Sequence, residues 1–145
     1  MLRRGFLLGA VAVVATGIFA ARWYNIGAEI GEDALSAPEA LARAQLGEIL
    51  LVDIRRPDEW QATGIPLGAV PLDLRRDDFV EALLAEAGGD RARPVALICA
   101  RGVRSARLGK RLSQAGFTAI LDVPEGMLGS GAGPGWLARG LPVMQ

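Results

Sequence analysis

The pattern of apolar and polar positions divides the chain into a long uncharged N-terminal run and a series of short alternating segments. Short apolar runs end in turn residues, and the segments between them carry apolar residues at helical spacing. This alternation predicts an α/β domain: a parallel sheet of about five strands with helices on both faces. The expected strands cover residues 49–54, 70–74, 95–98 and 118–123. The expected helices cover residues 36–45, a short segment from residue 57, a segment from residue 77 to the glycines at 88–89, and residues 104–115.

Two helix starts can be predicted from side chains that cap free backbone N–H groups. Ser36-Ala-Pro-Glu39 has the capping-box spacing, with proline in the first turn where its missing N–H costs nothing. Asp77 is expected to cap the third helix.

The uncharged run at residues 5–21 predicts a signal or transmembrane helix within residues 1–26. Seventeen residues are few for a spanning helix, but the Arg22 side chain can extend toward the interface and lengthen the apolar part. Trp23 and Tyr24 follow, where aromatic side chains gather at membrane interfaces. We therefore expect an N-terminal membrane anchor.

Charges around this run predict its orientation. Arg3 and Arg4 precede it and few basic residues follow, so the domain is expected to face the periplasm from a bacterial inner membrane. The arginine pair also resembles a twin-arginine export signal, which leaves the export route open. Cleavage and release are the alternative, although the large Ile18 makes residues 18–20 a poor cleavage motif. A tether over residues 27–35 and a domain over 36–143 complete the expected organisation.

The only cysteine, Cys99, ends the apolar run 95–98 and is followed by a tight loop and a helix. This order places a thiol beyond the carboxyl end of a parallel strand, where such sheets bind ligands. The free N–H groups and the dipole at the helix start favour an anion there. Arg101 and Arg104 add positive charge, and Gly102 lets the loop turn. The pattern favours a reactive thiolate over a buried structural cysteine.

The amino-acid composition excludes several kinds of catalytic and metal-binding site. The chain has 145 residues, no histidine and one cysteine, which excludes imidazole catalysis, imidazole metal ligands and an intramolecular disulfide. Bases and acids number 16 each, but the chain without residues 1–25 has three more acids than bases. Nucleic acid is therefore not an expected partner.

The segment from Cys99 to Ser105, Cys-Ala-Arg-Gly-Val-Arg-Ser, resembles the active-site loop of rhodanese-type sulfurtransferases. Three further segments, 51–60, 64–69 and 125–143, resemble motifs of that family in the same order. Ala100 stands where the family often has arginine, and the histidine usual in the second of these segments is absent. The resemblance runs from about residue 36 to 143 and implies a single rhodanese-like domain.

The resemblance implies sulfur transfer through a persulfide on Cys99, without a metal or organic cofactor. The donor would be a small anion such as thiosulfate, and the acceptor cyanide, a thiol or a thiol-bearing protein. The implied substrate-binding residues are Ala100, Arg101, Gly102, Val103, Arg104 and Ser105. Asp53 lies in an apolar strand and needs a partner, which Arg55 or Arg56 can supply. By the resemblance, Asp53 and Arg55 support the site.

Two other functions remain as alternatives. Cdc25-type phosphatases share this fold by resemblance, but their loops place arginine six positions after the cysteine, where this chain has Ser105. A non-catalytic, membrane-tethered docking module is the second alternative, although such a module would not need the thiol. The glycine-rich stretch 126–135 is either a wall of the pocket, which we favour, or a long connection.

Overall fold

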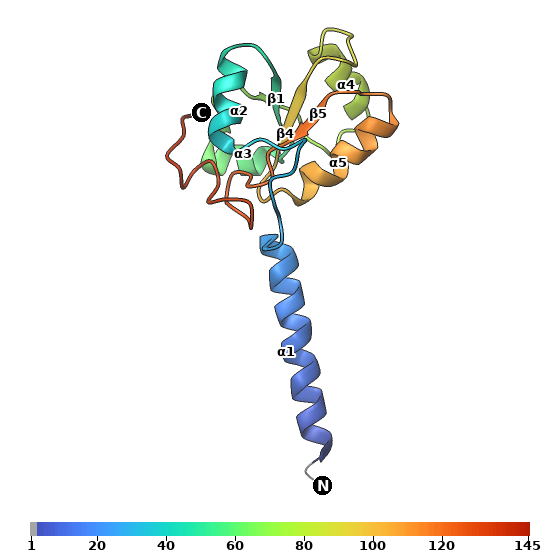
Figure 1. Cartoon of the computed structure of the whole chain (residues 1–145), viewed down its shortest axis with the longest axis vertical. Coiled ribbons are helices and arrows are strands. Elements are labelled where there is room, and N and C mark those ends of the chain that lie inside the picture. The colour runs from blue at the N-terminus through green and yellow to red at the C-terminus, as the bar shows by residue number, and fades with distance from the viewer. Residues whose placement is uncertain (1–2) are drawn as a thin grey trace.

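The structure, a computed structural model, describes residues 3–145, with side chains described from residue 14 onward. A long N-terminal helix projects from an α/β domain, and the C-terminus lies on the side of the domain near α2 (Figure 1). The elements in chain order are α1 (Arg3–Tyr24), α2 (Ala37–Gln45), β1 (Leu50–Asp53), α3 (Pro57–Thr63), β2 (Ile65–Pro66), β3 (Val70–Pro71), α4 (Phe79–Glu86), β4 (Val95–Ile98), α5 (Val103–Gln114), β5 (Ile120–Asp122) and β6 (Val143–Met144).

The central sheet has four parallel strands in the order β3-β1-β4-β5. The two central strands pair along their full length, from Leu50 opposite Val95 to Asp53 opposite Ile98. The expectation of about five strands in one sheet is therefore wrong. The remaining strands, β2 and β6, form a separate antiparallel pair. Each has only two residues, too few for a periodic pattern to reveal.

Helices cover both faces of the sheet, as predicted (Figure 1). Alternate residues of β1 and β4 enter two separate cores because successive side chains of a strand point to opposite faces. On one face, Val52 and Leu97 pack with Leu83 of α4 and Leu112 of α5. The other core contains Leu51 and Ile98 of the sheet, Ala37 and Ala40 of α2, and Met127 and Trp136 from the C-terminal segment.

Of the two predicted helix caps, one is confirmed and one is wrong. At Ser36 both capping-box contacts form: the Ser36 N–H donates to Glu39 Oε2 at 2.9 Å, and the Glu39 N–H donates to Ser36 Oγ at 3.5 Å. Asp77 does not cap α4, which begins two residues later after Asp78. The Asp78 carboxylate forms no cap either, because it accepts hydrogen bonds from the Arg76 guanidinium at 2.8 and 2.7 Å.

The predicted membrane segment falls largely on residues whose side chains are not described. Arg3, Arg4 and residues 5–13 lie outside the described side chains. Within the described part of the chain, no helix combines the length and the apolar character needed to cross a membrane. The expected tether ends against the domain: Ala34 bridges Asp122, and Leu35 is buried.

Candidate active site

Cys99 follows β4 directly, and its side chain is 1% exposed. Its sulfur accepts a hydrogen bond from the backbone N–H of Gly102, with an N–Sγ distance of 3.1 Å. The Ser105 hydroxyl lies 3.6 Å from the same sulfur and donates to the Gly102 carbonyl at 3.2 Å. Because α5 begins at Val103, the sulfur lies at the positive end of a 12-residue helix. This geometry stabilises negative charge on the sulfur.

Glycine is required at two places where the Cys99 loop meets the glycine-rich segment. Gly102 has a φ of +82°, and a Cβ there would collide with the Pro124 carbonyl oxygen. Gly126 has a φ of +64°, and a Cβ there would collide with the Ala100 carbonyl oxygen. Both collisions are with backbone, which cannot move aside as a flexible side chain can.

The glycine-rich segment packs along the Cys99 loop and forms one wall of the pocket above it. Met127 N–H donates to the Cys99 carbonyl, and Leu128 N–H donates to the Ala100 carbonyl, both at 2.9 Å. The Leu128 side chain lines the pocket. The interpretation of residues 126–135 as a pocket wall therefore agrees with the structure at this residue.

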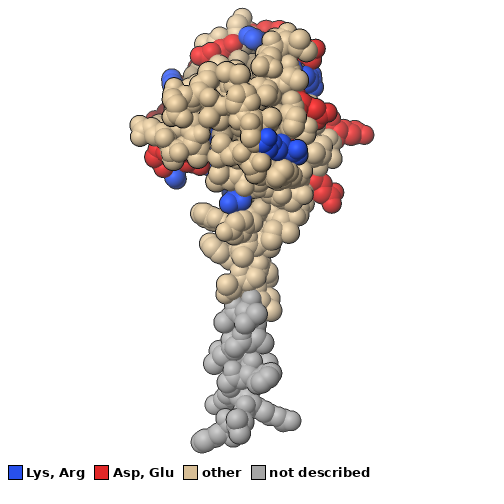
Figure 2. All heavy atoms as spheres, turned by 90° about the vertical axis from the view of Figure 1, so that its left-hand side faces the viewer, with Lys and Arg blue, Asp and Glu red and all other residues tan. Residues whose placement is uncertain are grey.

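The pocket over the Cys99 loop is a cavity of about 430 Å³ in which four arginines accompany one acid. Its walls come from α1, α3, the Cys99 loop and the glycine-rich segment. The lining residues are Arg22, Trp23, Arg56, Glu59, Ala100, Arg101, Val103, Arg104 and Leu128. Figure 2 shows charged side chains over the domain and at its junction with the helix, while the described part of α1 further from the domain carries none on this face. The pocket is therefore predominantly positive and suits an anionic ligand.

Arg104 reaches across the pocket to Glu59 of α3. Its two terminal nitrogens donate to the two carboxylate oxygens at 2.8 and 2.6 Å, a bidentate pair. Hydrogen bonding to Glu59 raises the pKa of Arg104 above its usual range. Burial acts to raise the pKa of Glu59, but Arg104 and the Arg56 N–H outweigh it and hold that pKa below its usual range. The pair thus remains ionised beside the thiol.

Arg101 extends to the glycine-rich segment. One of its terminal nitrogens donates to the carbonyls of Leu128 and Gly129, at 3.2 and 3.1 Å. Its guanidinium carbon lies 4.4 Å from the centre of the Tyr24 ring, within cation–π distance. In this structure Arg101 holds two walls of the pocket together, a role that its sequence position did not predict.

Asp53 and Arg55 form a fully buried ion pair that contacts α3. The Arg55 guanidinium donates to the Asp53 carboxylate at 2.9 and 2.7 Å, which selects Arg55 rather than Arg56 as the partner of Asp53. Its other donors bind Thr63 Oγ1 and the Gly64 carbonyl, each at 2.8 Å. Arg55 therefore fixes the C-terminal end of α3, the helix that carries Glu59.

The structure brings most of the predicted loop residues together around the sulfur. Gly102 and Ser105 are buried beneath it, and Ala100, Arg101, Val103 and Arg104 line the pocket. Sequence analysis did not predict Arg22 and Trp23 as pocket residues, nor the contact of Glu59 with Arg104. Glu59 lies in the segment 51–60 that resembles a family motif. Its local sequence pattern does not predict that it pairs with a residue 45 positions away. Among the described side chains, no three Cys, Asp or Glu residues lie close enough to hold a metal ion.

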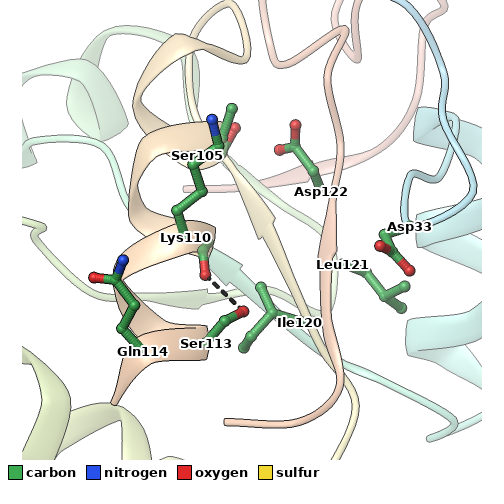
Figure 3. A pocket seen from close by; sticks show the side chains of 10 residues that line it. Asp33, Ser105, Lys110, Ser113, Gln114, Ile120, Leu121 and Asp122 are labelled. Atoms are coloured by element: carbon green, nitrogen blue, oxygen red, sulfur yellow. Dashed lines mark hydrogen bonds between the residues drawn. The ribbon is translucent and has the colours of Figure 1, made fainter. Parts of the chain in front are cut away.

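A second cavity, of about 530 Å³, lies between α5 and β5 and is lined in part by Ser105. Figure 3 shows the Asp122 carboxylate pointing across it toward Ser105, with Lys110 further along α5. One Asp122 oxygen, Oδ1, is buried and has no hydrogen-bond partner among the residues that the structure describes. Burial raises the pKa of Asp122 to about 6, and contacts with the Ser105 hydroxyl and the Val123 backbone oppose this only in part.

The raised pKa of Asp122 predicts that the free energy of unfolding depends on pH. A raised folded-state pKa means that folding favours the protonated acid. The stability that the protonated Asp122 contributes is therefore complete below the unfolded pKa of 3.8, and it is lost as pH rises through about 6. We expect Asp122→Asn to gain about 1.4 kcal/mol over wild type between pH 5 and pH 8, roughly half of the full effect of the raised pKa. Urea unfolding of the full chain at both pH values measures the difference. The exposed Glu81→Gln should track wild type, and equal behaviour of the two variants would contradict the prediction.

Comparison with known proteins gives a family for most of this chain. A sequence model described as the rhodanese-like domain matches residues 36–129. No curated protein sequence matches the chain significantly.

Among solved structures, the fold is similar to a polysulfide-sulfur transferase homodimer from Wolinella succinogenes, at 29% identity and a TM-score of 0.56, covering 92% of this chain and 88% of that one. It is also similar to a thiosulfate sulfurtransferase from Pseudomonas aeruginosa (24% identity, TM-score 0.60), covering 77% of this chain and 20% of that one. A human single-domain sulfurtransferase, TSTD1, has 22% identity and a TM-score of 0.53, with 75% and 98% of the two chains covered. The last two likenesses show the fold alone.

Proposed function

The chain belongs to the rhodanese-like domain family, and from that membership we propose that it transfers a sulfane sulfur atom through a persulfide on Cys99. The observation that carries the proposal is the Cys99 sulfur itself. It accepts a backbone hydrogen bond at the start of α5, and the loop residues next to it line a pocket whose walls are rich in arginine. These features favour a thiolate nucleophile and an anionic substrate.

The proposed reaction has two displacement steps. The Cys99 thiolate attacks the outer sulfur of thiosulfate, the S–S bond of the donor breaks, and sulfite leaves with the bonding electron pair. Cyanide or a thiolate then attacks the outer sulfur of the Cys99 persulfide, and the Cys99 thiolate is regenerated. Covalent catalysis of this kind divides one transfer between two simpler displacements, with no net oxidation or reduction of the enzyme.

Residues of the loop stabilise the charged species in both steps. The Gly102 N–H holds negative charge on the Cys99 sulfur, and the Ser105 hydroxyl is within reach of the same atom. Arg104 keeps a positive charge at the pocket wall while pairing with Glu59. Fixed dipoles and charges of this kind stabilise anions without reorganising during the reaction.

Small anionic sulfur compounds are the donors that we propose. Thiosulfate fits the arginine-rich pocket, and polysulfide is a second candidate because the Wolinella succinogenes structure belongs to a polysulfide-sulfur transferase. The acceptor is cyanide, a small thiol or a thiol-bearing protein. Incubating the protein with thiosulfate should add about 32 Da at Cys99, and cyanide should then remove that mass as thiocyanate. Failure to load sulfur from either donor would favour the docking-module alternative.

Arg104 provides a quantitative test of the pocket's charge. Arg104→Ala should lower kcat/KM for thiosulfate by about ten- to a hundredfold, because a charge-assisted contact is lost and Glu59 loses its bidentate partner, with only the longer ion pair to Arg56 remaining. Steady-state kinetics of thiocyanate formation measure the loss. Arg107→Ala removes the same charge from an exposed position further along α5 and should change kcat/KM far less. Similar losses in both variants would mean that only the general basic character of α5 matters.

For the location of the domain, we propose the periplasmic face of a bacterial inner membrane, with the segment 1–26 as anchor or export signal. The proposal is based on the uncharged run 5–21 and the arginines before it. Alkaline phosphatase fused after Gln145 should be active in intact cells, because this reporter folds only after export. An inactive fusion with normal protein levels would place the domain in the cytoplasm.

A further inference from the structure

The end of α1 is attached directly to the Cys99 loop. Asn25 follows the helix with a φ of +50°, which turns the chain, and its side-chain amide donates to the Arg101 carbonyl at 2.9 Å. Tyr24 covers the face of the Arg101 guanidinium. The Gly131 N–H donates to the Asn25 carbonyl at 2.8 Å. Residues 22–25, which we call the N-terminal arm, are thus held by the loop on one side and by the glycine-rich segment on the other.

The glycine-rich segment is shaped to receive this arm. A Cβ at Gly131 would collide with the Ile26 carbonyl oxygen, so only glycine allows the two backbones to approach this closely. The contact places Arg22 and Trp23 in the wall of the Cys99 pocket. The arm precedes residues 36–129, the part of the chain that matches the family model. It is therefore an addition to the site from outside the matched region.

Arg22 differs from the other pocket arginines in having no partner within the described residues. Arg56 pairs with Asp58 at 3.0 Å, and Arg104 pairs with Glu59. Arg101 is engaged by two carbonyls and by Tyr24. No ion pair forms between Arg22 and any carboxylate that the structure describes, and its side chain is exposed at the pocket mouth. Arg22 is thus a free cation beside a site that must attract an anion.

We propose that Arg22 binds the anionic sulfur donor at the mouth of the Cys99 pocket, which makes the N-terminal arm part of the active site. This inference rests on the sulfur-transfer function proposed above and names a donor-binding residue for it. The ligand class is a small sulfur oxyanion or polysulfide with its charge at the end remote from the attacked sulfur. Trp23 and Leu128 provide apolar surface on two sides of the same mouth. The sequence had assigned Arg22 only to a membrane interface.

The test compares Arg22→Gln with Arg43→Gln in the full-length chain. Both variants lose one positive charge, but Arg43 lies on α2, outside the pocket, and pairs with Glu48. Arg22→Gln should raise KM for thiosulfate about fivefold while kcat stays within about twofold. Arg43→Gln should change neither constant. A loss confined to kcat, or equal effects in the two variants, would overturn the proposal.

A second measurement does not depend on sulfur transfer. The rates at which iodoacetate, an anion, and iodoacetamide, a neutral reagent of similar shape, alkylate Cys99 report the charge at the pocket mouth. Arg22→Gln should lower the iodoacetate-to-iodoacetamide rate ratio about fivefold, whereas Arg22→Lys and Arg43→Gln should nearly retain it.

The two measurements separate the two proposals. If Arg22→Gln lowers the iodoacetate-to-iodoacetamide rate ratio but the wild-type protein forms no thiocyanate, Arg22 is supported as the anion-binding residue and sulfur transfer is excluded as the function. An unchanged ratio would overturn the role of Arg22 whether or not the protein transfers sulfur. It would leave Arg22 with the structural role of a cation at the negative end of the α1 dipole.

Discussion

Replacing Cys99 by serine is expected to abolish sulfur transfer, with thiocyanate formation falling at least about a thousandfold. The serine oxygen would need a general base to become a nucleophile, and the chain contains no histidine to serve as one. It also cannot carry a persulfide. The initial rate of thiocyanate formation from thiosulfate and cyanide measures the effect.

Cys99→Ala provides the matched comparison, because alanine has no nucleophilic atom at all. The serine and alanine variants should be equally inactive, and neither should gain about 32 Da on incubation with thiosulfate. Activity that survives in the serine variant would exclude the persulfide route. Hydrolysis of aryl phosphates should be negligible in wild type, because Ser105 stands where a phosphatase loop needs arginine. A phosphatase turnover comparable to sulfur transfer would favour the phosphatase alternative.

The largest expected effect on stability comes from Arg55→Met. The substitution keeps an apolar chain of similar length but leaves the Asp53 carboxylate, which is fully buried, without its ion partner. Loss of one member of a buried pair typically costs about 3–5 kcal/mol of the free energy of unfolding. Urea unfolding of the full chain, followed by circular dichroism, measures this loss.

The chain contains its own control for this experiment. Arg75 and Asp73 form an ion pair with the same sequence spacing and the same bidentate contacts, at 3.0 and 2.6 Å, but the Arg75 side chain is 63% exposed. Arg75→Met should therefore cost at most about 1 kcal/mol. If Arg55→Met and Arg75→Met were equally mild, the buried pair would not be what holds α3. Asp53→Leu combined with Arg55→Leu should restore part of the lost stability, since no charge is then left buried.

Several features of the fold could be predicted because each is contained within one continuous segment. The apolar runs around Val52 and Leu97 identify β1 and β4, since a strand buried on both faces must be apolar throughout. The capping box at Ser36 needs only residues three positions apart. The position of Cys99 between a strand and a helix follows in the same way, as does the predicted covering of both sheet faces.

The separate antiparallel pair of two-residue strands could not be predicted in this way. β2 and β6 pair across about 80 residues of chain, and neither is long enough for alternation to appear in its sequence. Asp77 and Asp78 are equally suited to cap α4, and a neighbouring arginine engages the second one instead. In each case the outcome depends on which partner lies nearby in space.

The amino-acid sequence was enough to predict the nucleophile, its loop and the α/β framework, because strand, loop and helix are consecutive and their preferences are local. The distribution of charge around that nucleophile depends instead on how distant segments fold together. Glu59 reaches Arg104 across 45 positions, and Asn25 reaches Arg101 across 76. Such pairings arise when separate segments fold against each other, and no local pattern of apolar and polar residues encodes them. The arginine that the structure leaves free for a ligand, Arg22, is therefore one whose sequence context suggested only an interfacial residue at the end of an apolar helix.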